Sequence, residues 1–216
     1  MPFKYPVQWR SNFVNAVAPA RPATTPATVP DPRYLIPTVQ NVISVVTFDC
    51  QLDLETIASK APNCKYDPDR FPAVVMRTRD PSTAATIFES GKVVVTGARS
   101  ERDSRVAARK YMGIIQEVGF RAKFKNIGIH DIVLLYNVGF PVYLEGIAST
   151  HHMFSSYEPE LFPGLVYNLL LLKVRLIIFA TGRIMITGAR TRGAAYEAFN
   201  LFYPVLLEFR RARGRG

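Results

Sequence analysis

The chain has 216 residues, of which 48% are hydrophobic, and its formal net charge is +10. This length allows a substantial core in one or two domains. No apolar run reaches the roughly 18 residues that a membrane span needs, and no secretory signal pattern is visible. These absences exclude a membrane protein and predict a soluble intracellular one, while the basic charge favours a polyanionic partner.

Residues 1–37 are predicted to form a disordered, proline-rich N-terminal tail. Eight of the 16 prolines precede Thr38, and the segment has too little apolar surface to offset the entropy that ordering would cost. Four aromatic side chains leave open a short segment that docks on a partner: Phe3, Tyr5, Trp9 and Phe13. Scattered aromatic residues in a tail are the simpler interpretation.

The next segment predicts a strand, a short helix and several more strands. Asn41 to Phe48 has the pattern of a strand, and Asp53 is placed to cap a short helix after it. Apolar positions then recur with period two, which predicts strands with one packed and one amphipathic face. The packed face comprises Val74, Met76, Ala85, Ile87, Val93 and Val95. Two turn sequences, Asp80 to Thr83 and Ser90-Gly91, make these strands antiparallel neighbours.

A long helix follows, because the period of the apolar residues changes to 3.6 after Gly97. Ser100 fits the N-cap position, and Gly119 marks the C-terminal end. The face opposite the apolar stripe carries Arg102, Arg105 and Arg109. Each half of the chain is therefore predicted to be an α+β unit, with helices on one side of a curved antiparallel sheet.

Two stretches of the chain repeat each other 91 residues apart. The run that starts at Gly91 reads GKVVVTGAR, and the run that starts at Gly182 reads GRIMITGAR. Two phenylalanines recur at the same offset, so the matched pairs are Phe71 with Phe162 and Phe88 with Phe179. An internal repeat of this length predicts two half-domains that make one pseudo-symmetric body.

The predicted domains differ in charge. We assign residues 38–127 to the first repeat, 128–209 to the second, and 210–216 to a basic C-terminal tail. The first repeat has 14 Lys and Arg against 10 Asp and Glu, whereas the second has 5 against 6. The positive charge is therefore concentrated in the first repeat and in the tails.

The four matched phenylalanines favour a ligand surface over ordinary core packing. A buried position is the usual interpretation of a single Phe, but Phe88 and Phe179 are predicted to lie on the sheet face away from the helices. Thr96 and Thr187 occupy equivalent positions on that face. Double-stranded DNA is pseudo-two-fold, elongated and anionic, and its minor groove admits apolar wedges between base steps. DNA is therefore the ligand that this pattern favours.

From about Ile36 to Phe209 the chain resembles the conserved core of the TATA-box-binding protein family. The runs that carry the resemblance are Arg70-Phe71 with Ala73 to Arg77, Ile87 to Lys92, Ala107 to Tyr111 and, above all, the run FSSYEPELFPGL from Phe154 to Leu165. The resemblance implies a saddle of two repeats whose concave sheet sits on the minor groove of DNA. It also implies a general transcription initiation factor in the nucleus, without a cofactor. The implied partners are promoter DNA, IIB-type and IIA-type factors, and TBP-associated factors.

The resemblance further implies roles for individual residues. The inserting wedges match Phe71, Phe88, Phe162 and Phe179. Central polar and apolar groove contacts match Asn41, Thr96, Thr187, Ile43, Val94 and Val133. Basic positions near phosphates match Arg70, Arg77, Lys92, Arg99, Arg183 and Arg190. The loop presented to a IIB-type factor matches Glu158, Glu160 and Leu161, and the face used by IIA-type factors and repressors matches the helix with Arg102, Arg105 and Arg109.

Several positions depart from the family pattern, and Asp131 is the most informative. It stands where the pattern has a second central Asn, and Asn168, Leu171 and Leu172 replace an Arg, a Lys and a Pro. We expect Asp131 to face the groove, where A·T pairs offer only acceptors and a carboxylate can only accept. The alternative is that Asp131 turns aside to cap a neighbouring backbone group. These departures weaken the expected preference for a TATA sequence.

Three other functional classes remain open. A related scaffold with weak or relaxed DNA preference, acting through protein partners, accounts better for Asp131 and the neutral second repeat. A negative regulator that competes with the standard factor is a third class. An enzyme fits least, because no Gly-rich phosphate loop follows a strand. A metal site is not expected either, because Cys50 and Cys64 are too few and the adjacent His151 and His152 diverge on a helix.

Overall fold

The structure is a computed structural model that describes residues 35–211. The predicted N-terminal tail up to residue 34, and residues 212–216 of the predicted C-terminal tail, lie outside the described residues. The first half forms β1 (Thr38–Phe48), α2 (Leu54–Lys60), β2 (Cys64–Asp67), β3 (Phe71–Arg79), β4 (Ser82–Ile87), β5 (Lys92–Ala98) and α3 (Glu101–Val118). The second half forms β6 (Phe124–Asn137), α4 (Leu144–Thr150), β7 (Ser155–Ser156), β8 (Gly164–Leu169), β9 (Val174–Phe179), β10 (Arg183–Thr187) and α5 (Arg192–Glu208).

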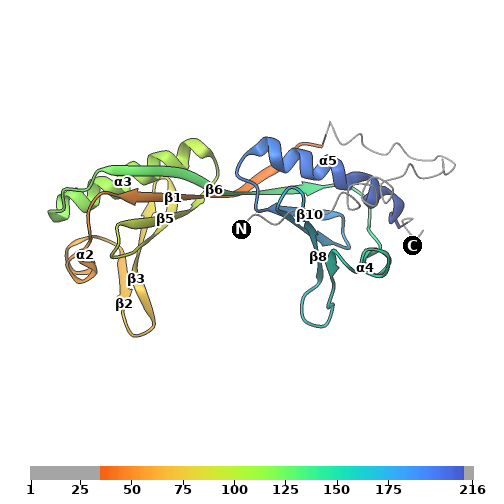
Figure 1. Cartoon of the computed structure of the whole chain (residues 1–216), viewed down its shortest axis with the longest axis horizontal. Helices are drawn as coiled ribbons and strands as arrows, with labels where there is room; N and C mark the ends of the chain where they lie inside the picture. The colour runs from red at the N-terminus through yellow and green to blue at the C-terminus, as the bar shows by residue number, and fades with distance from the viewer. Residues whose placement is uncertain (1–34, 212–216) are drawn as a thin grey trace, which may run out of the picture.

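The ten strands of the described residues join one antiparallel sheet in the order β2-β3-β4-β5-β1-β6-β10-β9-β8-β7. This order is symmetric, because the first strand of each half lies at the centre and the others follow outward in the same sequence. The sheet is arched like a saddle, with α3 and α5 along its convex face and the β2–β3 and β7–β8 loops extending on the other side (Figure 1). The predicted α+β fold, with two repeats and helices on the convex face, is confirmed.

The two halves are joined through β1 and β6. These strands pair along most of their length, from Thr38 opposite Leu135 to Phe48 opposite Phe124. The predicted boundary between the repeats, at residues 127 and 128, falls inside β6, so this strand belongs to both halves. The division into domains stays a prediction, with β6 as the shared element.

Three of the helices begin at a capping side chain, and the sequence predicts two of these caps, Asp53 and Ser100. Asp53 accepts hydrogen bonds from two backbone N–H groups of α2, and Ser100 accepts one from the backbone N–H of Asp103 in α3 at 2.9 Å. Thr191, which stands 91 residues after Ser100, caps α5 in the same way. Gly119 ends α3 with a φ of 117°, a left-handed conformation that glycine adopts without strain.

Two hydrophobic cores lie between the sheet and its helices, one in each half. The predicted packed face of the first repeat is fully buried, as Val74, Met76 and Ala85 illustrate. In the second core, the Tyr136 ring stacks on Phe199 of α5, with centroids 3.8 Å apart. No helix in the described part of the chain is long and apolar enough to cross a membrane.

The repeated glycines Gly91 and Gly182 occupy the turns before β5 and β10. Both have positive φ, at 80° and 85°. A Cβ atom on Gly91 would overlap the carbonyl oxygen of Cys50, and one on Gly182 would overlap that of Phe140. The close approach of these two chain segments explains why glycine appears at both positions of the repeat.

Arg210 and Arg211 contact the folded body, although they begin the predicted C-terminal tail. Arg210 forms an isolated β-bridge with Val142. The Arg211 guanidinium lies 4.5 Å from the centroid of the Tyr143 ring, and its Nη2 lies 3.5 Å from a carboxylate oxygen of Glu145. These contacts hold the first two tail residues beside the start of α4.

An ion pair links the two convex helices across the centre of the saddle. The Arg192 guanidinium donates to both carboxylate oxygens of Glu101, at 2.8 and 2.7 Å. The two residues stand 91 positions apart, so the pair joins equivalent first turns of α5 and α3. The hydrogen bond from Arg192 lowers the pKa of Glu101 below its ordinary value of 4.5. Stability from this pair is therefore fully present above that value and is lost as the pH falls through the lowered pKa.

We expect a double-mutant cycle of Glu101→Gln and Arg192→Gln to give a coupling free energy of about 0.5 kcal/mol at neutral pH. The side chains are 29% and 40% exposed, so solvent screening keeps the value small. Urea unfolding of the four proteins measures the coupling free energy. The cycle subtracts the effect of Glu101 on the helix dipole, because that effect does not depend on Arg192. The coupling should vanish in acid, and an equal coupling at both pH values would contradict this assignment.

Candidate nucleic-acid interface

Side chains from four central strands form the concave face of the sheet. On β1, the partly exposed Asn41, Ile43 and Val45 alternate with buried residues that pack under the helices. The neighbouring strands alternate in the same way and add Val94, Thr96, Val133, Leu135, Met185 and Thr187. The face is therefore largely apolar and open, as expected of a binding surface. Val45, Leu135 and Met185 are not among the contacts predicted from the sequence, although the period of two that places Ile43 on this face also places Val45 there.

The four matched phenylalanines form two pairs with nearly the same geometry. The rings of Phe71 and Phe88 meet edge to face, with centroids 6.2 Å apart and an interplanar angle of 69°. The rings of Phe162 and Phe179 repeat this arrangement at 6.0 Å and 65°. Phe71 and Phe162 are 46% and 43% exposed, and their partners are half-buried. Each half thus presents one aromatic pair whose outer ring is open to solvent.

The centre of the concave face holds a matched pair of polar contacts. The Gly97 backbone N–H donates to Asn41 Oδ1 at 2.7 Å, and the Gly188 N–H donates to Asp131 Oδ1 at 2.7 Å. The Thr187 hydroxyl donates to the other carboxylate oxygen of Asp131 at 2.5 Å. Asp131 therefore caps a backbone group, which corrects the expectation that it faces the groove freely. The reason is that two nearby donors satisfy both carboxylate oxygens.

All six predicted phosphate-contacting residues are exposed. They lie in or near strands β3, β5 and β10, in both halves: Arg70, Arg77, Lys92, Arg99, Arg183 and Arg190. None of the six forms an ion pair with an acidic side chain in residues 35–211. Their charges are therefore available to an anionic ligand from both halves of the saddle.

The loop between β7 and β8 carries the predicted contact for a IIB-type factor. Glu158, Glu160 and Leu161 are all exposed, and Leu161 reaches 86%. The Glu158 carbonyl oxygen accepts hydrogen bonds from the backbone N–H groups of Leu161 and Phe162, which fixes the turn. The two carboxylates and the leucine are thus presented to solvent beside the aromatic pair of the second half.

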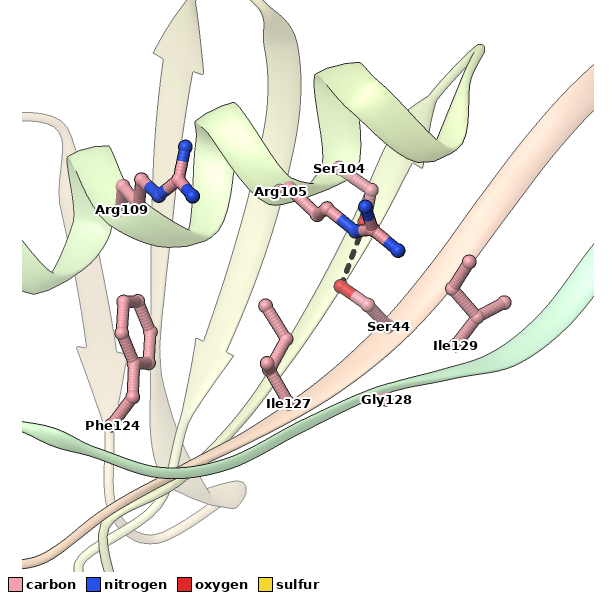
Figure 2. Close-up of a pocket in the computed structure, with 8 residues that line it drawn as sticks. All are labelled: Ser44, Ser104, Arg105, Arg109, Phe124, Ile127, Gly128 and Ile129. Carbon is pink, nitrogen blue, oxygen red and sulfur yellow. Dashed lines mark hydrogen bonds between the residues drawn. The ribbon is translucent and has the colours of Figure 1, made fainter.

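A pocket of about 320 Å³ lies on the convex face between α3 and β6 (Figure 2). Arg105 and Arg109 line it from the helix, whereas the third predicted arginine, Arg102, does not. Its other side is apolar and includes Ile127, which is 42% exposed. Beneath it, the Ser104 hydroxyl donates to Ser44 at 2.7 Å. The arginines are predicted from the sequence, but Ile127 is not, because it reaches this pocket only where β6 passes under α3.

His151, Cys50 and Cys64 are partly buried. His151 Nδ1 lies 3.1 Å from the Tyr167 hydroxyl, and burial lowers the pKa of His151. Cys50 and Cys64 are free thiols, and burial raises the pKa of both. Within residues 35–211, no group of three or more His, Cys, Asp or Glu side chains is placed to hold a metal ion.

Comparison with known proteins identifies the family. The family model described as transcription factor TFIID, or TATA-binding protein, matches residues 36–118 and 126–209. The chain belongs to the TATA-binding protein family. The TATA-box-binding protein of Emericella nidulans is 54% identical over 197 residues, which cover 91% of this chain and 74% of the relative. TATA-box-binding protein 2 of Arabidopsis thaliana is 54% identical over 182 residues, covering 84% and 91%.

A solved structure of the family supports the same assignment. The TBP of Methanococcus jannaschii superposes with a TM-score of 0.70 at 32% sequence identity, and the match covers 80% of this chain and 98% of that one. The two segments that match the family model fall on the two halves of the sheet, separated only by the connection from α3 to the start of β6. The whole saddle is therefore shared with the family.

Proposed function

We propose that this protein is a general transcription initiation factor that binds promoter DNA in the minor groove, bends it, and recruits IIB-type and IIA-type factors to a preinitiation complex. The duplicated aromatic pair carries the proposal, with centroid distances of 6.2 and 6.0 Å in the two halves. Membership of the TATA-binding protein family supports it. The same membership supports a nuclear role, binding rather than catalysis, and TBP-associated factors as further partners.

The concave face suits a minor groove that bending has opened. Ile43, Val94 and Val133 would lie against the floor of the groove, and each aromatic pair would enter between base pairs at one end of the contacted site. Unstacking costs a few kcal/mol per step, and the bent duplex recovers that cost by covering more protein surface. The exposed basic residues would then neutralise phosphates on both strands.

A scaffold that acts mainly through protein partners is the second candidate function. Two observations favour it: both oxygens of the Asp131 carboxylate are already bonded inside the protein, and the second repeat has 5 basic against 6 acidic residues. A scaffold would bind A·T-rich and G·C-rich duplexes with similar, weak affinity. Matched titrations of the two duplexes at one fixed salt concentration separate it from the initiation factor.

We expect the double variant Phe88→Ala, Phe179→Ala to lose DNA bending more completely than it loses non-specific affinity. Wedge insertion depends on these rings, whereas non-specific affinity depends on phosphate contacts. Fluorescence transfer between dyes at the two duplex ends measures the bend. Tyr196→Ala is the control, because it removes a partly exposed aromatic ring from α5 on the convex side. Equal bend angles for the wild type and the double variant would refute wedge insertion.

Charge reversal in the β7–β8 loop should impair recruitment of a IIB-type factor and leave binary DNA binding nearly unchanged. Glu158 and Glu160 are exposed and would repel a nearby duplex, so their role is a protein contact. The test compares Glu158→Lys, Glu160→Lys with Glu55→Lys, Glu117→Lys, which makes the same charge change elsewhere on the surface. A gel shift of the ternary complex provides the measurement. Normal recruitment by the loop variant would count against this surface.

The first repeat should dominate the salt dependence of DNA binding. Each phosphate contact that is lost removes about 0.9 from the slope of log affinity against log salt concentration. Replacing Arg77 and Lys92 with Gln should flatten this slope more than replacing Arg183 and Arg190 with Gln, because the second repeat has no net positive charge. Each pair serves as the control for the other. Equal flattening would indicate that the two halves share the phosphate contacts.

A further inference from the structure

The two halves of the saddle present different hydrogen-bonding groups at equivalent central positions. In the first half, Asn41 uses its Oδ1 to accept from Gly97, and its amide nitrogen has no partner among the described residues. The Thr96 hydroxyl likewise has no partner in residues 35–211. Both groups can therefore donate to a ligand on the concave face. The first half presents donors at the centre.

The second half presents acceptors only. A carboxylate has no proton to donate, and the single hydroxyl proton of Thr187 is committed to Asp131 Oδ2 at 2.5 Å. That length is typical of a hydrogen bond from a hydroxyl to a charged oxygen. Such a bond is roughly twice as strong as one between neutral groups. Asp131 is only 9% exposed, whereas Thr187 is partly exposed. The Thr187 oxygen, which accepts no hydrogen bond from residues 35–211, is therefore the group that a ligand meets.

The minor groove offers a matching difference between base pairs. A·T pairs show only acceptors there, while a G·C pair adds the N2 amino group of guanine, which donates. A protein group that can only accept forms no hydrogen bond with an A·T pair there, but it can accept one from the guanine amino group. A protein group that donates has the opposite preference, because it can donate to the acceptors of an A·T pair.

We propose that Asp131 holds Thr187 as a hydrogen-bond acceptor, so that the second half selects a G·C pair at the central base step it covers while the first half selects A·T. Asp131 is thus a positioning residue and Thr187 is the contact. The recognised site is asymmetric at its centre, and the protein binds it in one orientation although its fold is pseudo-symmetric. This inference rests on the proposed binding in the minor groove.

The test uses duplexes with one A·T-rich core in which each central base pair in turn is G·C or inosine·C. Inosine lacks the amino group but leaves the major-groove edge of the pair unchanged. For the wild type we expect one central position at which G·C binds about fivefold more tightly than inosine·C, the low end of discrimination by a base-edge contact. Fluorescence anisotropy at fixed salt gives both affinities, and their ratio is insensitive to loss of folded protein.

Three variants make the assignment specific. Asp131→Asn keeps an oxygen for the Gly188 N–H and offers Thr187 an amide donor, which frees the Thr187 proton for the groove, so the preference should reverse. Thr187→Val removes the acceptor and should abolish the preference without reversing it. Asn41→Asp recreates the second-half carboxylate in the first half and should add a second central position that favours G·C.

Two results would overturn the inference and leave the proposed function standing. One is a wild type that binds and bends these duplexes but favours inosine·C at every central position. The other is an Asp131→Asn protein with the wild-type ratio. Absence of binding to every duplex would overturn the proposed function and this inference together.

Discussion

The pairing of β1 with β6 is the contact on which the rest of the molecule depends. It carries the sheet from one half into the other, so that all ten strands of the described residues form one surface. Both strands contribute to both cores. From β1, Val46 packs in the first core and Val42 in the second, and from β6, Phe124 packs against the first core and Ile132 lies in the second. The twist of neighbouring strands accumulates across this sheet, while helices cover only its convex face. No helix of the described chain packs on the concave face, so this face is open to solvent.

The open face has a cost that the cores must offset. Apolar side chains such as Ile43 and Val94 remain partly exposed, and Phe71 and Phe162 keep nearly half of their surface in solvent. Burial of this surface would contribute about 25 cal/mol per Å², so the free protein leaves that stabilisation unused. A ligand that covers the face recovers it. The same face that weakens the free fold is thus the source of affinity for DNA under the proposed function.

The backbone of the molecule is nearly symmetric between the two halves, whereas the charged and polar side chains are not. Strand order, the N-caps of the two long helices, turn glycines and aromatic pairs repeat closely between the halves. Net charge and the central polar groups do not repeat, because Asp131 stands where the first half has Asn41 and the second repeat has 5 basic against 6 acidic residues. A symmetric scaffold with asymmetric contacts can bind a nearly palindromic ligand in a single orientation. For a transcription initiation factor, the orientation on the DNA would set the direction in which the assembled complex faces.

The sequence by itself determined most of the local structure. The period of two located the strands and their buried face, Ser100 and Asp53 fixed helix starts, and the repeat at offset 91 predicted two equivalent halves with four matched phenylalanines. Strand periods and helix caps depend on residues that are close in the chain, and the repeat is visible when the sequence is compared with itself. The tertiary structure alone decided which groups that are far apart in the chain meet one another. The bond from Thr187 to Asp131, the pair of Glu101 with Arg192 and the position of Ile127 under α3 join residues far apart in the chain. Period and spacing give the face on which a side chain lies, but its partner depends on strand register and on how the helices pack across the sheet.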